Sequence, residues 1–190
     1  MFIAHLPAGY LTASLVARRL GVPASSGLVL AGLAGGIFPD IDLLYATLID
    51  HWSVHHHRYW THLPLFWLTV SAAALLLFRL TGETRQRTVA FLLAVWGHLL
   101  LDSVAGDIWW LWPWLDVPFS LVTIPAIHSP WYLNYLLHWT FALELIFVAS
   151  GVGSAMSRSS DQKALKPSPG RSTSSGTPQK ANALNCLCRK

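Results

Sequence analysis

The stretch Leu20–Asp42 reads LGVPASSGLVLAGLAGGIFPDID. It carries no charge as far as Pro39 and then presents two carboxylates, Asp40 and Asp42. A helix needs about 20 predominantly apolar residues to cross a bilayer, so this stretch predicts a membrane helix with a broken, acidic end. Carboxylates beside hydrocarbon are costly and usually mark a functional site. Asp40 and Asp42 therefore either converge on a cation or cap the helix that starts near Ile41.

Further apolar stretches lie on both sides of this segment. They contain no Asp, Glu, Lys or Arg and cover Phe2–Ala17, Leu63–Phe78, Val89–Leu101 and Pro118–Leu143, with a continuation from Leu145 to Met156. Only 12% of the residues are charged, whereas 53% are hydrophobic. We therefore predict an all-α fold, a multi-pass membrane helical bundle of about four to five apolar helices. A soluble bundle of buried helices is the alternative, because several stretches are shorter than a full span.

The positive charges predict an orientation for this bundle. If the first helix starts outside and each apolar segment crosses once, all but one of the 13 Lys and Arg residues lie on the same side. The exception is Arg58. An excess of Lys and Arg marks the cytoplasmic side of a membrane protein. We therefore expect an inner-membrane protein that crosses several times and has a cytoplasmic C-terminal tail.

The composition of the chain changes after Met156. Residues 1–156 are predicted to form one membrane-embedded domain, and residues 157–190 form a basic segment rich in Ser, Pro, Gly and Thr. A segment of this composition buries too little apolar area to offset its ordering entropy. We therefore expect residues 157–190 to be a disordered tail.

Histidine and aspartate residues recur where the predicted topology places the outer ends of the helices. His98 and Asp102 are four residues apart, so on a helix they share a face and reach one metal ion. His57 and His62 are five apart in a loop, which favours an irregular turn between them. His5, near the start of the first helix, is the weakest candidate. The alternatives are a plain hydrogen bond between His98 and Asp102 and a chance histidine-rich loop.

Seven residues form this series, and all fall at one membrane level although the charge rule did not use them. The predicted metal ligands are His5, Asp40, Asp42, His57, His62, His98 and Asp102. Imidazole suits Zn, Fe, Ni or Cu, and added carboxylates extend the choice to Mn. We expect His55 and His56 in the same loop to be bystanders.

At these motifs the chain resembles the YdjM-like family, described as inner-membrane-associated, LexA-regulated, metal-dependent hydrolases. The resemblance covers roughly residues 1–150. The motifs that carry it are His5 in the first helix, Pro39-Asp40-Ile41-Asp42, His57-Arg58 with Thr61-His62, His98-Leu-Leu-Leu-Asp102, and a later Trp112-Pro113. The chain departs from the family pattern at Leu43, Tyr59 and Leu63, which bears on the substrate more than on metal binding.

The family is distantly similar to the zinc-dependent phospholipase C and single-strand nuclease superfamily, helical proteins with a cluster of His and Asp ligands. This resemblance implies hydrolysis of a phosphoester. We therefore predict a membrane-bound, metal-dependent hydrolase that acts on a phosphoester or lipid-linked substrate through metal-activated water. Zn²⁺ is the first choice of metal, with Mn²⁺ or Fe²⁺ as alternatives. Membrane lipid, including phospholipid, is the expected partner, and nucleic acid is not.

Three residues are predicted to act in catalysis at the extracytoplasmic face. Asp40 or Asp42 would bridge the ions and orient the water as a base, and Arg58 would clamp a phosphate oxygen unless it anchors a lipid headgroup. A non-enzymatic protein that binds or transports a divalent metal is the alternative function. Three further residues have no assigned role: Glu144, a candidate for a transport path, His128 and His138.

Overall fold

The structure is a computed structural model that describes residues 3–76 and 80–165. Within these two ranges the protein is helical and contains no strand. The elements in chain order are α1 (His5–Leu20), α2 (Ser26–Ile37), η1 (Pro39–Ile41), α3 (Asp42–Leu48), η2 (His56–Arg58), η3 (Trp60–His62), α4 (Pro64–Leu76), α5 (Gly82–Ala105), α6 (Tyr132–Leu136) and α7 (Thr140–Leu165), where η marks a single 3₁₀ turn. The predicted all-α class is confirmed.

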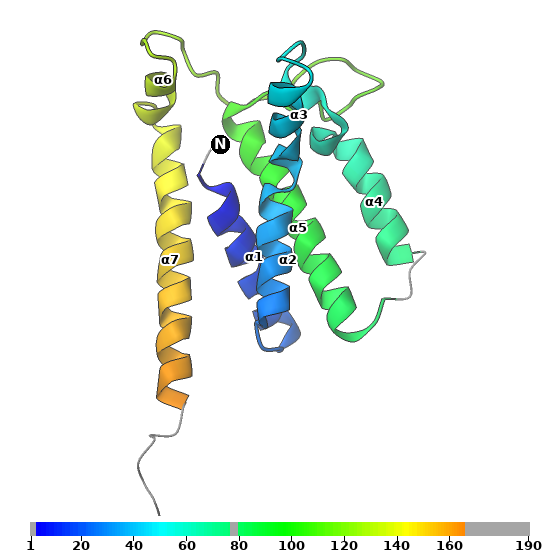
Figure 1. Ribbon diagram of the computed structural model, residues 1–190, viewed down its shortest axis with the longest axis vertical. Helices are drawn as coiled ribbons and strands as arrows, with labels where there is room; N and C mark the ends of the chain where they lie inside the picture. Colours follow the sequence, from blue (N-terminus) through cyan, green and yellow to red (C-terminus); the bar gives the residue numbers. More distant parts are fainter. Residues whose placement is uncertain (1–2, 77–79, 166–190) are drawn as a thin grey trace, which may run out of the picture.

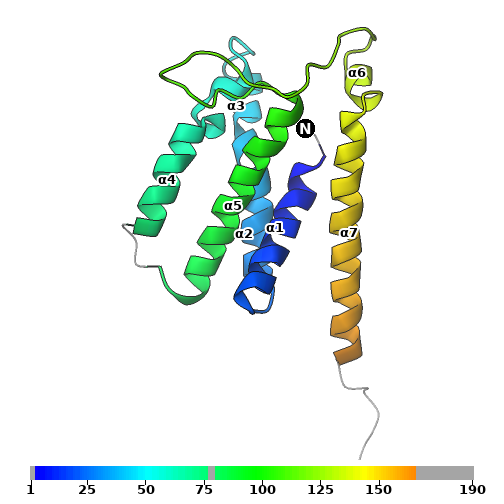
Figure 2. The ribbon, with the colours of Figure 1, turned by 180° about the vertical axis from the view of Figure 1, so that it is seen from behind.

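Helices α1, α2 and α5 pack against one another as the centre of the bundle. Helix α7 packs on α1 at one edge and α4 packs on α5 at the other (Figure 1 and Figure 2). Glycines let the central helices come close. A Cβ added at Gly36 of α2 would lie 2.5 Å from the carbonyl oxygen of His5 in α1, and one added at Gly35 would overlap the carbonyl oxygen of Phe91 in α5. Small residues of this kind are typical of helix contacts in membranes.

The number of membrane-crossing helices is smaller than predicted. Helix α5 and the segment Thr140–Ser160 of α7 are each long and apolar enough to cross, and α2 with the following Pro39–Leu48 counts as a third span bent by 56°. Two or three candidate spans therefore replace the expected four to five. Helices α1 and α4 have 16 and 13 residues, about 24 and 20 Å at 1.5 Å per residue, against roughly 30 Å of hydrocarbon.

The helices alternate in direction, so the start of α1, the ends of α2 and α5, and the starts of α4 and α7 lie at one end of the bundle (Figure 1). The connections that carry η2, η3 and α6 cover this end. Helix α7 continues past Met156 to Leu165, so the boundary expected at residue 156 falls inside a helix. The rest of the expected tail, residues 166–190, lies outside the described residues.

Candidate metal centre

Four imidazoles surround the carboxylate of Asp102 at this end of the bundle. The Nε2 atoms of His57, His62 and His98 lie 3.6, 3.5 and 3.0 Å from its Oδ2 atom. The Nε2 atom of His5 lies 3.0 Å from its Oδ1 atom. All five side chains are buried. Residues from α1, α5 and the 3₁₀ turns η2 and η3 therefore meet at one carboxylate near the end of α5.

The other ring nitrogen of three of these histidines is held by an oxygen atom, which fixes how each ring is turned. The Nδ1–oxygen distances are 2.7 Å from His98 to the Gly36 carbonyl, 3.1 Å from His57 to the Asp107 carbonyl and 2.6 Å from His62 to Asp42 Oδ2. A carbonyl oxygen only accepts, so the Nδ1 atoms of His98 and His57 carry the hydrogen and donate it. In a neutral imidazole the lone pair then lies on Nε2, which points at Asp102. Metal-ligating histidines are commonly oriented in this way.

Four ligand atoms form the first of two groups that could hold a metal ion, which we name the main group. It consists of Asp40, His62, His98 and Asp102, whose ligand atoms all lie within 4.8 Å of one another. Asp40 Oδ1 is 3.7 Å from His62 Nε2 and 3.6 Å from His98 Nε2. The side chain of Asp40 is 28% exposed, whereas the other three are buried. Two imidazoles with two carboxylates suit Zn, Mn or Fe.

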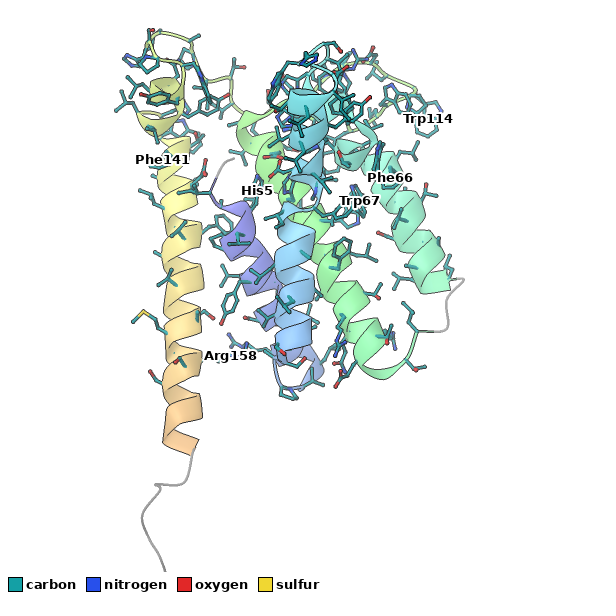
Figure 3. The ribbon with its side chains drawn as sticks, viewed as in Figure 1. His5, Phe66, Trp67, Trp114, Phe141 and Arg158 are labelled. Atoms are coloured by element: carbon teal, nitrogen blue, oxygen red, sulfur yellow. The ribbon has the colours of Figure 1, made fainter. Side chains whose placement is uncertain are left out.

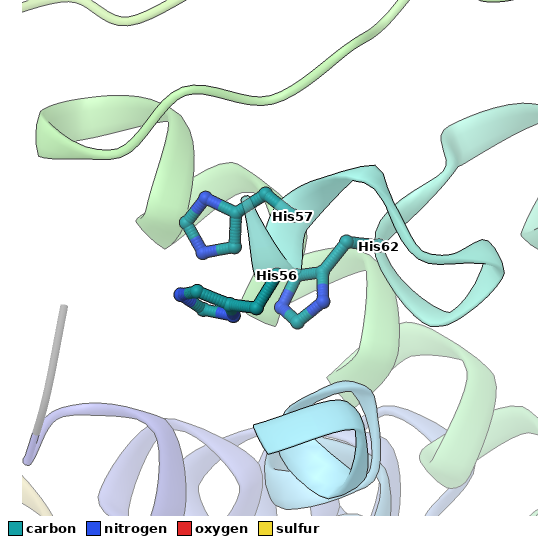
Figure 4. Close-up of side chains that lie close together, drawn as sticks. All are labelled: His56, His57 and His62. Atoms are coloured by element: carbon teal, nitrogen blue, oxygen red, sulfur yellow. The ribbon is translucent and has the colours of Figure 1, made fainter. Parts of the chain in front are cut away.

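A second group of three histidines adjoins the first and shares His62 with it. We name His56, His57 and His62 the histidine group, and their rings lie together in Figure 4. The Nδ1 atom of His56 is 3.6 Å from Asp42 Oδ1. His56 was expected to be a bystander, because nothing in a run of three histidines shows which rings turn inward. The fold of η2 decides this by turning His56 and His57 toward His62.

Several buried polar atoms of the cluster have no hydrogen-bond partner among the described residues. They are Nδ1 of His5, Oδ1 of Asp42 and Nδ1 of His56. A buried polar atom left without a partner costs about 1–3 kcal/mol. The ring of His5 also stacks on that of His98 with centroids 3.8 Å apart, and Figure 3 shows His5 at the start of α1, below the connecting loops. The donor types and the unsatisfied atoms both fit a divalent metal ion.

The two histidines of the loop have pKa values shifted in opposite directions. Burial lowers the pKa of His57 to about 2, although the carboxylate of Asp102 opposes the shift. Burial also disfavours the charged form of His62, but hydrogen bonds to Asp102 and Asp42 outweigh it and raise the pKa of His62 to about 9. Without a metal ion, both ring nitrogens of His62 therefore carry hydrogen at neutral pH, and the ring is positively charged. A metal ion must displace one of these protons to bind there.

Local features of the chain place these side chains. The break at Pro39 turns the chain so that Asp40 lies in η1 and Asp42 starts α3. The hydroxyl of Thr61 donates to Asp42 Oδ2 at 2.6 Å, so Asp42 is held by the same loop that carries His62. A Cβ added at Gly106, just after α5, would lie 2.7 Å from Cε1 of His57. The glycine therefore leaves the space that the His57 ring fills.

The structure brings all seven predicted ligands together, but Asp42 and Arg58 lie differently from the simplest expectation. Asp42 belongs to neither ligand group. Its carboxylate contacts the Nδ1 atom of His62, on the side of the ring away from Asp102. Arg58 forms a two-pronged ion pair with Asp116 at 2.8 and 2.9 Å and lies over the ring of Trp109. Arg58 thus joins η2 to the loop after α5, and its charge is already matched.

The three residues without an assigned role lie outside both ligand groups. Glu144 is buried in α7, and its Oε2 atom accepts a hydrogen bond of 2.6 Å from the backbone N–H of Ile3. The Nδ1 atom of His138 is 3.0 Å from the hydroxyl of Thr140 at the start of α7. The backbone of His128 is bonded by the side chain of Asn134. All three residues therefore take part in hydrogen bonds within the fold.

A cavity of about 560 Å³ adjoins the cluster. Its wall includes Asp40, His56, His57 and Asp102 from the two ligand groups. The remaining lining residues are Leu43, Trp52, His55, Ala105, Gly106, Asp107, Ser120, Val122, Thr123, Ile124, Trp131 and Tyr135. Asp107 was not singled out from the sequence, although it follows α5 directly and so lies at the same end of the bundle. A small molecule in this cavity would contact the cluster.

The fold and the cluster define a class: a helical membrane protein with a buried group of His and Asp side chains suited to a metal ion. A family model described as YdjM inner membrane protein matches residues 1–161. The chain therefore belongs to the YdjM family, and the resemblance found from the sequence motifs is confirmed. No curated protein and no solved structure matches the chain, so the distant superfamily similarity stays a prediction.

Proposed function

We propose that the protein is a membrane-bound, metal-dependent hydrolase that cleaves a phosphoester, with a membrane lipid as its substrate. The observation that carries the proposal is the convergence of three oriented Nε2 atoms on Asp102 beside a cavity that Asp40 also lines. A metal ion with only a structural role is enclosed by protein ligands and needs no cavity beside it. Catalytic metal sites keep one coordination position open for water or substrate.

The main group would hold one divalent ion, for which Zn²⁺ fits the two imidazoles and two carboxylates. His56 and His57 of the histidine group would hold a second ion with Asp42 close by, while the shared His62 serves the main group. When bound, such ions neutralise a phosphate group and make water available as hydroxide near neutral pH. His5 stacks on His98 and contacts Asp102, so it supports the main group from the side of α1.

Asp40 is the carboxylate best placed to handle a proton during hydrolysis. It is partly exposed and lines the cavity, so a water molecule in the cavity can donate a hydrogen bond to it. Asp42 is buried, and its Oδ2 atom accepts from Thr61 and contacts His62. We therefore assign Asp42 the orientation of His62 rather than proton transfer. Arg58 is assigned to the tether with Asp116 rather than to a phosphate clamp.

The side of the membrane on which the site lies follows from the charge distribution. Of the described residues, Arg18, Arg19, Arg85, Arg87 and Arg158 lie on parts of α1, α5 and α7 toward the end of the bundle opposite to the cluster, whereas Arg58 lies at the end that carries it. The positive-inside rule then supports a site at the extracytoplasmic face and a C-terminal tail in the cytoplasm. A cysteine introduced at exposed Ser53, labelled by an impermeant thiol reagent in intact cells, tests this orientation.

The test of the function is purification in detergent, metal analysis and a screen of phospholipids and soluble phosphodiesters for hydrolysis. We expect at least one equivalent of metal and phosphoester hydrolysis, both lost in His98→Ala and in Asp102→Ala. His128→Ala, a histidine exchange outside the cluster, serves as the matched control and should retain both. Metal below one equivalent that is unchanged in the two cluster variants would overturn the proposal.

A further inference from the structure

The cavity wall beyond the two ligand groups has an unusual balance of charge. Of the described residues that line the cavity, none is Lys or Arg, while three are aspartates: Asp40, Asp102 and Asp107. Asp40 and Asp102 belong to the main group and would be occupied by a metal ion. Asp107 belongs to neither ligand group. Its carboxylate is therefore the negative charge that a bound metal leaves facing the cavity.

The side chain of Asp107 is held at the cavity by a hydrogen bond. The hydroxyl of Ser120, also in the wall, donates to Asp107 Oδ1 at 3.0 Å. The backbone carbonyl of the same residue accepts from Nδ1 of His57. Asp107 is thus fixed directly beside the histidine group, in the wall of the same cavity.

Aromatic side chains form another part of the same wall. Trp52, Trp131 and Tyr135 line the cavity. Trp52 is 54% exposed and follows His51 in a turn where both residues have positive φ angles, 50° for His51 and 61° for Trp52. Non-glycine residues adopt this conformation at a cost, and such strain is most often retained at binding sites. The turn places the large aromatic ring of Trp52 at the cavity, where it is not needed to fill the protein core.

We propose that this part of the cavity binds the ammonium group of a zwitterionic phosphate ester, so that the substrate is an amino-bearing phospholipid. The inference rests on the proposed function, in which the metal ions take the phosphate. Aromatic faces carry partial negative charge and attract ammonium groups, and a carboxylate among them supplies the countercharge. A second anionic group would be repelled by Asp107, and a neutral hydroxyl would gain only a hydrogen bond.

Three phosphonates, each with its terminal nitrogen or oxygen three bonds from phosphorus, test this selectivity without being hydrolysed: aminoethylphosphonate, hydroxyethylphosphonate and carboxymethylphosphonate. Their binding to the zinc-loaded protein in detergent is measured by calorimetry. We expect the ammonium compound to bind about tenfold more tightly than the hydroxyl compound, and the carboxylate compound to bind most weakly. Tighter binding of the hydroxyl compound would point to a sugar or glycerol headgroup and overturn the proposal.

Asp107→Asn removes the charge while its amide oxygen still accepts from Ser120, and the His57 contact uses the backbone. We expect this variant to lose the tenfold preference while its zinc content stays unchanged. Trp52→Leu should weaken ammonium binding and Trp52→Phe should largely restore it. Glu83→Gln, at the opposite end of α5 and outside the cavity wall, is the matched control for loss of one carboxylate.

The outcomes also separate this inference from the proposed function. Equal binding of all three phosphonates, or an unchanged preference in Asp107→Asn, would refute the ammonium site while leaving metal-dependent hydrolysis intact. Loss of zinc in His98→Ala with no hydrolysis of any phosphoester by the wild type would refute the hydrolase instead. In that case the phosphonate preference still reports whether the cavity selects a cation.

Discussion

Replacement of Gly106 by alanine tests how His57 is placed in the cluster. The backbone at Gly106 has φ −128° and ψ 150°, which alanine adopts without strain, so the effect is purely one of space. The added Cβ would lie 2.7 Å from Cε1 and 3.4 Å from Nδ1 of His57, and 3.0 Å from the backbone carbonyl oxygen of Asp102. Carbon atoms pack at about 3.5–4.0 Å, so the ring must shift by about 1 Å. Such a shift is enough to break the 3.1 Å contact with the Asp107 carbonyl.

The expected consequence is weaker metal binding with a modest loss of stability. Loss of the contact that orients a metal-binding histidine typically costs about 10–100-fold in affinity, and overpacking costs about 1–3 kcal/mol. Zinc affinity is measured by competition with a chelator, and stability by thermal unfolding in the same detergent. Gly97→Ala is the matched control, because a Cβ at Gly97 in α5 meets nothing within 4 Å.

A double exchange shows whether the effect passes through His57. If it does, Gly106→Ala combined with His57→Ala binds zinc about as tightly as His57→Ala alone, because the clash with the ring is gone and only the 3.0 Å contact with the Asp102 carbonyl oxygen remains. Wild-type zinc affinity in Gly106→Ala would show that the His57 ring is not where the structure places it. An additive loss in the double variant would show that Gly106 acts on the fold and not on the metal ligand.

Four further predictions concern the charges around the cluster. Asp42→Asn should lower zinc affinity by about 10–100-fold without removing a member of either ligand group, and zinc competition with a chelator would contradict this if it found no change. Zinc binding should tighten as pH rises toward 9, because His62, whose pKa is raised from 6.5 to about 9, must lose its proton. In the metal-free protein the same raised pKa contributes stability that is complete below pH 6.5 and is lost as pH rises through about 9, which thermal unfolding across this range measures. Arg58→Ala should lower stability by less than about 1 kcal/mol, because both partners of its ion pair are exposed; a loss of bound zinc in this variant would contradict the tether assigned to Arg58.

The sequence predicted the parts of the site that depend on short-range geometry. The spacing of His98 and Asp102 placed both on one face of α5, and their heads lie 3.0 Å apart. Alternation of apolar stretches predicted that all seven ligands lie at one end of the bundle. The number of spans was wrong, because the helices α1 and α4, with 16 and 13 residues, are shorter than a full crossing, and hydropathy alone does not show where a helix stops.

Other parts of the site depend on contacts between distant segments, and these the sequence could not show. His56 enters the cluster because η2 turns it toward His62, and Asp42 orients His62 because the break at Pro39 directs it to η3. The role of Gly106 depends on a ring that comes from the loop before α4. Arg58 was predicted to bind phosphate because Asp116, 58 residues away, gives no sign in the sequence that it is the partner.

The charges of the cluster suit a bound cation. Asp40, Asp42 and Asp102 meet at the end of the helices, and imidazoles are among their ion-pair partners. Burial keeps His57 neutral, so protonated His62 supplies one positive charge within this set. Bound protons and a metal ion are therefore alternative ways to balance the carboxylates, and a protonated imidazole nitrogen cannot be a ligand. Both His62 nitrogens contact carboxylates, which stabilise the proton in the metal-free protein. A divalent ion that binds at His62 would replace this proton. The protonation state of His62 should therefore report most directly whether metal is bound.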